Sequence, residues 1–186
     1  MLALVVVLVV LVVLAVAAVA VYHRLVQRRN RVDNAWSQIV VQLKRRHDLI
    51  PNLVEAVKDY LTYEQETLTK VTEARAAAID AGRRGPAAQA AAENALSETL
   101  KSLFAVFENY PDLKANQNVM SLQEELTTTE NRIAFARQFY NDTVLTYNNA
   151  IQVFPANLVA NAFGFRPREY FAAAEGDRAV PAVDIH

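Results

Sequence analysis

The sequence predicts an all-α protein with an N-terminal transmembrane helix followed by an antiparallel four-helix bundle of long helices. Two observations lead to this prediction. The first 22 of the 186 residues are all hydrophobic, and beyond residue 23 apolar side chains recur every three or four residues, as on one face of a helix. No segment alternates polar and apolar residues between turn dipeptides, as a strand does. We expect a transmembrane anchor at 1–22, a helical bundle at 23–174 and an irregular tail at 175–186.

The uncharged run over residues 1–21 is long enough to cross a membrane. As a helix it extends about 31 Å, which matches the roughly 30 Å hydrocarbon core of a bilayer. A cleaved secretory signal is the alternative, because residues 15–20 offer the small side chains of a cleavage site. We favour a permanent anchor, since no Lys or Arg precedes the run and the run exceeds the apolar core of a signal peptide.

The charges beside the apolar run predict its orientation. Four arginines follow the run directly, at Arg24, Arg28, Arg29 and Arg31. The positive-inside rule then places the N-terminus outside and the C-terminal domain in the cytoplasm. Arg24, Arg28 and Arg29 form a basic collar, which either attracts anionic lipid head groups or only enforces the topology. We therefore expect the lipid bilayer as a partner of this segment.

Charge is divided between two parts of the chain. Residues 23–47 carry seven Lys or Arg and one acidic residue, whereas the rest of the chain carries twelve basic and nineteen acidic residues. The basic part holds a single interleaved aromatic residue, Trp36, and lies beside the expected membrane. We therefore do not expect nucleic-acid binding.

The first soluble helix has apolar residues at intervals of four, three and four, namely Val32, Trp36, Ile39 and Leu43. Trp36 is expected in the core because it falls in this phase. Asp48 is placed to cap a second helix, with Pro51 in the first turn of that helix. One helix kinked at Pro51 is the alternative, because the apolar heptad phase continues through Ile50 and Val57.

The later helices are separated by Gly and Pro. Residues 82–86 are the clearest loop, and Pro86 is placed to start a helix that opens with an alanine-rich stretch and ends before Pro111. The longest segment runs from about residue 118 to 154. A short helix at about 156–162 follows, with Gly164 as its expected cap. Short connections between the four principal helices predict antiparallel neighbours.

The composition excludes several kinds of chemistry. The chain has no Cys, which removes thiol catalysis, disulfides and cysteine-ligated metals. None of its four Gly residues has dinucleotide-fold or P-loop spacing. Of its three His residues only His47 lies well inside the domain, so zincin and ferritin-like di-iron sites are disfavoured. We predict no catalytic residue, no metal site and no cofactor.

Polar residues on the first soluble helix are candidates for recognition, namely Arg31, Asp33, Asn34 and Gln38. A polar row beside an apolar stripe is most often an interhelical hydrogen-bond seam, and a surface for an external partner is the alternative. The neighbouring charges include Arg46 and His47, for which an acid–base pair with a cationic clamp is the functional interpretation. We favour a charge cluster at a helix end, because no second convergent catalytic group is evident.

Two further features lie nearer the C-terminus. Glu130, Asn131 and Arg132 follow three threonines in the last long segment, and we favour a structural polar layer over a ligand or partner site. An aromatic patch follows the main helix, at Phe163, Phe165, Tyr170 and Phe171. Such a patch usually packs onto the end of a bundle. If it is exposed, it is a docking surface or a second membrane contact.

Several segments form a recognisable set, at 22–26, 29–39, 42–54, 130–134, 140–142, 147–148, 154–157, 163–165 and 178–181. Together they resemble the LemA family of bacterial single-pass membrane proteins. The resemblance covers nearly the whole chain. It implies a protein of the bacterial cytoplasmic membrane with a four-helix bundle in the cytoplasm, and it implies no particular reaction.

The sequence therefore favours a membrane-anchored, non-enzymatic scaffold or adaptor. Its expected partners are the bilayer, a second copy of the chain, and a membrane or cytoplasmic protein. The alternative is a ligand-binding sensor or a hydrolase with a polar site between helices near Arg31, His47 and Glu130. A closed core favours the scaffold, and a pocket that gathers these side chains favours the alternative.

Overall fold

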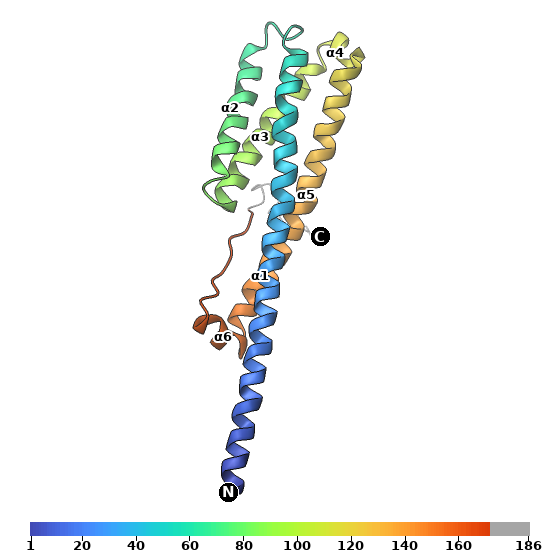
Figure 1. The fold of residues 1–186 in the computed structure, drawn as a ribbon. Helices are drawn as coiled ribbons and strands as arrows, with labels where there is room; N and C mark the ends of the chain where they lie inside the picture. Colours follow the sequence, from blue (N-terminus) through green and yellow to red (C-terminus); the bar gives the residue numbers. More distant parts are fainter. Residues whose placement is uncertain (172–186) are drawn as a thin grey trace, which may run out of the picture. The chain divides into compact units, whose positions relative to one another are not determined.

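The structure, a computed structural model, describes residues 1–171, which form six helices and no strand. The helices are α1 Leu2–Val57, α2 Gln65–Ala81, α3 Pro86–Phe107, α4 Pro111–Ala115, α5 Gln117–Gln152 and α6 Ala156–Ala162 (Figure 1). The all-α prediction is confirmed, and the short helix expected at 156–162 is present as α6. The expected antiparallel four-helix bundle is not confirmed, because the described residues form six helices. The predicted tail and the motif at 178–181 lie outside the described residues.

The chain is divided into two compact units. Unit 1 comprises Met1–Gln38 and Gln138–Glu169. Unit 2 comprises Ile39–Arg137 and the segment that begins at Tyr170. Helices α1 and α5 each contribute residues to both units.

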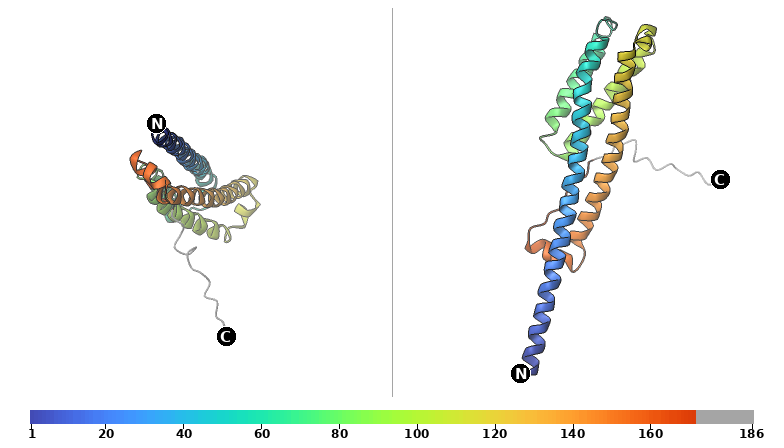
Figure 2. Two further views of the ribbon diagram at one scale, coloured as in Figure 1. Left: turned by 90° about the horizontal axis from the view of Figure 1, so that it is seen from below. Right: turned by 45° about the vertical axis from the view of Figure 1, so that its right-hand side comes forward.

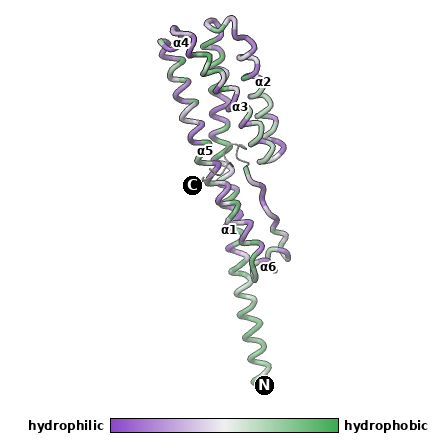
Figure 3. Tube along the Cα trace, turned by 180° about the vertical axis from the view of Figure 1, so that it is seen from behind, coloured by the Kyte–Doolittle hydropathy of each residue, from purple (hydrophilic) through white to green (hydrophobic). Residues whose placement is uncertain are grey.

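Helix α1 is continuous from the apolar run to Val57 and is the longest helix, with 56 residues against 36 in α5. From the sequence, we instead expected the longest segment at 118–154. Along the apolar run, the large side chains from Leu2 to Val19 are 51–81% exposed. Figure 3 shows this run as an uninterrupted hydrophobic stretch. Among the described residues, α1 is the one helix that has the length and composition to span a membrane.

Pro51 lies inside α1 and does not start a new helix, which corrects the expected boundary at Asp48 and agrees with the alternative of one helix through Pro51. A proline has no N–H, so the carbonyl of His47, four residues earlier, lacks its usual helical donor. Arg75 Nε of α2 donates to this carbonyl at 2.7 Å. Asp48 does not cap a helix and instead pairs with Lys44, one turn earlier, at 2.5 Å. The chain leaves the helix only after Val57.

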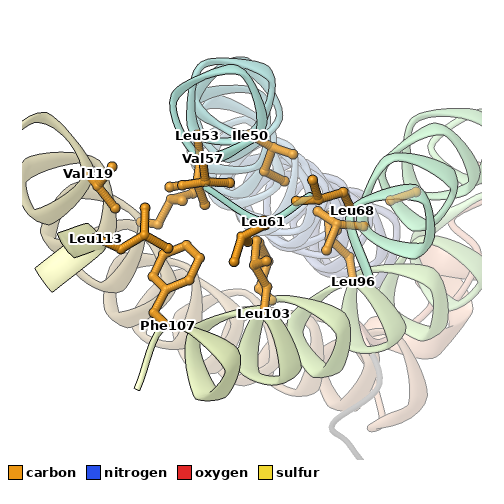
Figure 4. Close-up of a cluster of buried hydrophobic side chains, with 14 residues drawn as sticks. Ile50, Leu53, Val57, Leu61, Leu68, Leu96, Leu103, Phe107, Leu113 and Val119 are labelled. Atoms are coloured by element: carbon orange, nitrogen blue, oxygen red, sulfur yellow. The ribbon is translucent and has the colours of Figure 1, made fainter. Parts of the chain in front are cut away.

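The core of unit 2 is built from all of its helices. Helices α2 and α3 lie side by side (Figure 1 and Figure 2). Figure 4 shows side chains from α1, the following turn, and helices α2 to α5 converging on one apolar cluster. Its labelled members are Ile50, Leu53, Val57, Leu61, Leu68, Leu96, Leu103, Phe107, Leu113 and Val119. Burial of this apolar surface is the main force that holds the helices together.

The core of unit 1 joins the first part of α1 to the second part of α5. Its buried side chains are Leu25, Val32, Ala35, Tyr140, Val144, Tyr147, Ile151, Ala160 and Phe165. Trp36 is only half-buried, at the edge of this core, where its ring lies 5.4 Å from that of Tyr140. Ala35 takes the buried position that the sequence analysis assigned to Trp36.

The segment after α6 runs back along α5. Hydrogen bonds between the backbone of this segment and side chains of α5 hold it there. Tyr147 Oη donates to the carbonyl of Arg166 at 3.0 Å, and Tyr140 Oη donates to that of Glu169 at 2.8 Å. Asn148 both donates to and accepts from the backbone of Arg168, at 2.9 and 2.8 Å. These bonds satisfy the polar groups of an irregular segment.

Candidate functional site: a buried charged cluster

Unit 2 brings together three of the predicted residues, Arg46, His47 and Glu130, with two residues of α3 that the sequence analysis did not single out. Arg46 and Glu93 are 1% and 0% exposed. Arg46 forms ion pairs with Glu93 and Glu130. Its Nη1 also donates to Ser97 Oγ at 2.9 Å, and its Nη2 donates to the backbone carbonyl of Glu93 at 3.3 Å. One guanidinium group therefore connects α1, α3 and α5.

The remaining contacts close this cluster, which we call the Arg46 cluster (Arg46, His47, Glu93, Ser97 and Glu130). His47 Nε2 lies 2.9 Å from Glu93 Oε1. Ser97 Oγ donates to Glu130 Oε1 at 3.0 Å. Ser97 and Glu130 are half-buried, so the cluster extends from the interior towards the surface.

The charges of the cluster hold Glu93 in its ionised form. Burial on its own raises the pKa of Glu93, because the carboxylate loses water. The hydrogen bond with His47 and the positive charge of Arg46 outweigh this effect and bring the pKa of Glu93 below its ordinary value. Glu93 is therefore a charged partner for Arg46 at neutral pH.

A sequence signal for the cluster exists in the apolar stripes. Arg46 lies three residues after Leu43 and four before Ile50, in the position of a core residue. Glu93 likewise precedes Leu96 by three residues, directly after the alanine-rich stretch that opens this helix. A charged residue on the buried phase of a helix needs a partner of opposite charge. Arg46 lies inside α1, not at a helix end as expected.

The polar run of α5 that we expected to form a structural layer is buried only in part. Thr129 is buried in the stripe of α5, and its hydroxyl donates to the carbonyl of Glu125 at 2.7 Å. Glu130 joins the Arg46 cluster. Asn131 and Arg132 are exposed.

Unit 1 holds the other predicted residues. Arg31, Asn34 and Gln38 line one side of a cleft of about 630 Å³, opposite Phe139 and Asp142 of α5. Asp33 does not line this cleft and pairs instead with Arg168 at 2.9 Å. Arg31 thus belongs to a different unit from His47 and Glu130, and the alternative site near these three residues is not assembled within either unit.

The collar residues also lie in unit 1. Arg24 and Arg28 border an almost wholly apolar groove, and Arg28 Nη1 donates to the carbonyl of Thr146 at 3.3 Å. The Arg29 guanidinium carbon lies 5.4 Å from the centre of the Phe165 ring, a cation–π arrangement. Among residues 1–171, no group of three or more His, Asp or Glu side chains is arranged to hold a metal ion.

Comparison with known proteins identifies the family of the chain. The model of the LemA family matches residues 35–185. The chain is 28% identical to Protein LemA of Metamycoplasma hominis, over 84% of this chain and 71% of that protein. It is 27% identical to magnetosome protein MamQ 1 of Paramagnetospirillum magneticum and 26% identical to MamQ of Magnetospirillum gryphiswaldense, in both cases over 73% of this chain and 58% of the relative. The resemblance inferred from the sequence is confirmed, and the chain belongs to the LemA family.

Proposed function

We propose that the chain is a membrane-anchored, non-enzymatic helical scaffold or adaptor. The observation that carries this proposal is the closed state of the Arg46 cluster. Arg46, His47 and Glu93 are buried, and Arg46 and His47 each lie within ion-pairing distance of the Glu93 carboxylate. A catalytic acid, base or clamp has to reach a substrate. These side chains instead fix the packing of three helices.

The anchoring part of the proposal is supported by the exposed apolar run of α1. The side chains of Leu2–Val19 are not covered by the rest of the described chain, and water is a poor solvent for a surface of this kind. A bilayer covers it without a protein partner. The four arginines that follow the run support an N-terminus outside and a C-terminal domain in the bacterial cytoplasm.

The docking part of the proposal is supported by the cleft in unit 1. Arg31, Asn34 and Gln38 present donors and acceptors on one face of α1, and Asp142 adds a carboxylate from α5. This surface suits a polar protein segment, either from a second copy of the chain or from another membrane or cytoplasmic protein.

Photo-crosslinking in the native membrane tests this role. A crosslinking amino acid at Gln38, in the cleft, is expected to capture discrete protein partners that mass spectrometry identifies. As the control, the same crosslinking amino acid replaces Glu73, an exposed residue of α2. A chain that purifies only as a monomer in mild detergent, with no protein captured from Gln38, contradicts the scaffold role.

A reporter fused to the C-terminus tests the orientation. We expect activity from a reporter that works only in the cytoplasm. Activity from a periplasmic reporter at the same position contradicts the orientation and leaves the scaffold role to be judged by crosslinking.

A further inference from the structure

Large apolar side chains gather on α6 and the turns that flank it. Val153, Phe154, Leu158 and Phe163 are each 61–74% exposed, and we call them the α6 patch. Four exposed large apolar residues within eleven positions are unusual for a surface in water and mark an interaction site.

The turn after α6 is built to keep this patch exposed. Gly164 has φ +69°, and the N–H of Phe165 donates to the carbonyl of Ala160 at 2.9 Å. The N–H of Gly164 donates to the carbonyl of Asn161 at 3.4 Å, which completes the Schellman arrangement of a helix C-terminus. This turn directs Phe165 into the core of unit 1 and leaves Phe163 outside.

The patch lies at the level where the apolar run of α1 ends. The centre of the Tyr22 ring is 4.8 Å from that of Phe163 and 5.8 Å from that of Phe165. Figure 1 shows α6 beside the part of α1 that follows the apolar run. Tyr22 is the residue next to that run, so a bilayer that contains the run has its headgroup region at Tyr22. Phe163 then lies in the same region.

A groove next to the patch has the chemistry of a lipid contact. Its walls include Val21, Leu25 and Phe154, and its volume is about 350 Å³. Arg24 and Arg28 border it one helical turn apart. Apolar walls with adjacent arginines fit the acyl chain and the phosphate of an anionic phospholipid.

We infer that the α6 patch is a second membrane contact. Its side chains insert into the boundary between headgroups and acyl chains of the bilayer that holds α1, and Arg24 and Arg28 bind lipid phosphates beside it. This inference rests on the proposed membrane anchoring of α1. The occupant of the patch is the anionic lipid surface, and not a second copy of the chain.

Depth-dependent quenching tests the inference with the full chain. The chain has no Cys, so single Cys variants carry an environment-sensitive fluorophore at one position only. The positions are Leu158→Cys in the patch, Val10→Cys in the anchor and Tyr63→Cys in the turn after α1, where Tyr63 is 92% exposed. Each variant is reconstituted into phosphatidylglycerol–phosphatidylcholine vesicles that contain lipids with shallow or deep quenchers.

We expect shallow quenchers to reduce the Leu158→Cys signal, deep quenchers to reduce the Val10→Cys signal, and neither to reduce the Tyr63→Cys signal. If Leu158→Cys behaves like Tyr63→Cys while Val10→Cys is quenched, the patch is not a membrane contact and the anchoring still holds. An unquenched Val10→Cys overturns the anchoring together with the inference.

Two further measurements identify the occupant. In nanodiscs that hold one chain each, quenching of Leu158→Cys should persist, and quenching that appears only with several chains per vesicle shows a second copy instead. Combining Arg24→Gln and Arg28→Gln should reduce the quenching in phosphatidylglycerol vesicles to the level in pure phosphatidylcholine. Equal quenching in both lipids without the substitutions contradicts the role of lipid charge.

Discussion

Arg46 brings a permanent positive charge into the interior of unit 2. The guanidinium group is almost always protonated, so the fold has to supply carboxylates beside it. Glu93 and Glu130 do so from two different helices. Removing one partner of a buried pair leaves a charge without compensation, which costs far more than losing an exposed pair.

Replacing Arg46 by Met should therefore destabilise the protein strongly. Arg46→Met keeps much of the side-chain volume but leaves Glu93 buried without its arginine partner, at an expected cost of about 3–5 kcal/mol in the free energy of unfolding. The measurement is urea unfolding of the full chain in detergent, followed by circular dichroism. Lys44→Met removes an exposed ion pair from the same helix and should leave the midpoint nearly unchanged. Equal effects of the two substitutions would contradict a special role for the Arg46 cluster.

Glu93 should make stability sensitive to acid. Its pKa is lower in the folded protein than its ordinary value of 4.5. The stabilisation it provides is therefore fully present above that ordinary value and is lost as the pH falls through the folded pKa. Glu93→Gln should flatten the fall of the melting temperature below pH 4.5, from a lower starting stability.

The matched control for Glu93 is Glu98→Gln on the same helix. Glu98 is exposed and pairs with Lys101. This substitution should keep the acid dependence of the unsubstituted chain. Parallel pH profiles for Glu93→Gln and Glu98→Gln would show that the charge of Glu93 is not responsible for the loss of stability in acid.

At the scale of secondary-structure elements, α1 continues through Pro51 because another helix supplies the missing hydrogen bond. Arg75 of α2 donates to the His47 carbonyl that proline leaves without a helical donor. Helix α6, in contrast, is ended by residues of its own C-terminal turn and needs no contact from another helix. Its C-terminal turn needs a positive φ at Gly164.

A double-mutant cycle tests the link between Pro51 and Arg75. Arg75→Met leaves the His47 carbonyl unsatisfied and should cost about 1–3 kcal/mol. Pro51→Ala restores an N–H at that position, so Arg75→Met should cost less in the Pro51→Ala background. Both costs come from urea unfolding of the full chain. Identical costs in the two backgrounds would mean that Arg75 stabilises the protein in another way.

Gly164→Ala should destabilise unit 1 by about 1–2 kcal/mol, since a side chain at positive φ is strained. A Cβ there meets no atom within 4 Å, so the backbone conformation is the cause and not a clash. Gly164→Asn should cost less, because Asn tolerates this conformation better than Ala. Hydrogen exchange at the Phe165 amide measures the effect. Equal protection of this amide from exchange in Gly164→Ala and in the unsubstituted chain would contradict the predicted destabilisation.

At the scale of the whole molecule, attachment to the membrane should depend on the apolar run of α1. Combining Val7→Lys and Leu11→Lys places two charges near the middle of the run, each costing about 2.5–3.5 kcal/mol on insertion. Alkaline extraction of membranes should then release the chain.

Combining Val41→Lys and Phe135→Lys is the control, because both side chains are exposed outside the run. This variant should stay in the membrane fraction. Release of both variants, or of neither, would contradict anchoring by the apolar run.

Features that depend on neighbouring residues were predictable. The loop at 82–86, the helix start at Pro86, the end of that helix before Pro111 and the cap at Gly164 all agree with the structure, whereas α4 was not expected. The break before α2 was not predictable in this way. It contains neither Gly nor Pro, whereas Pro51, which resembled a break, is accommodated within α1.

The sequence by itself determined the helical class, the apolar run and the basic residues that follow it, because helix periodicity and membrane insertion depend on nearby residues. Only the tertiary structure decided which polar residues form a site. Arg46 finds its carboxylates 47 and 84 positions away. A buried charge is stable only beside such partners, and their positions depend on how three helices pack.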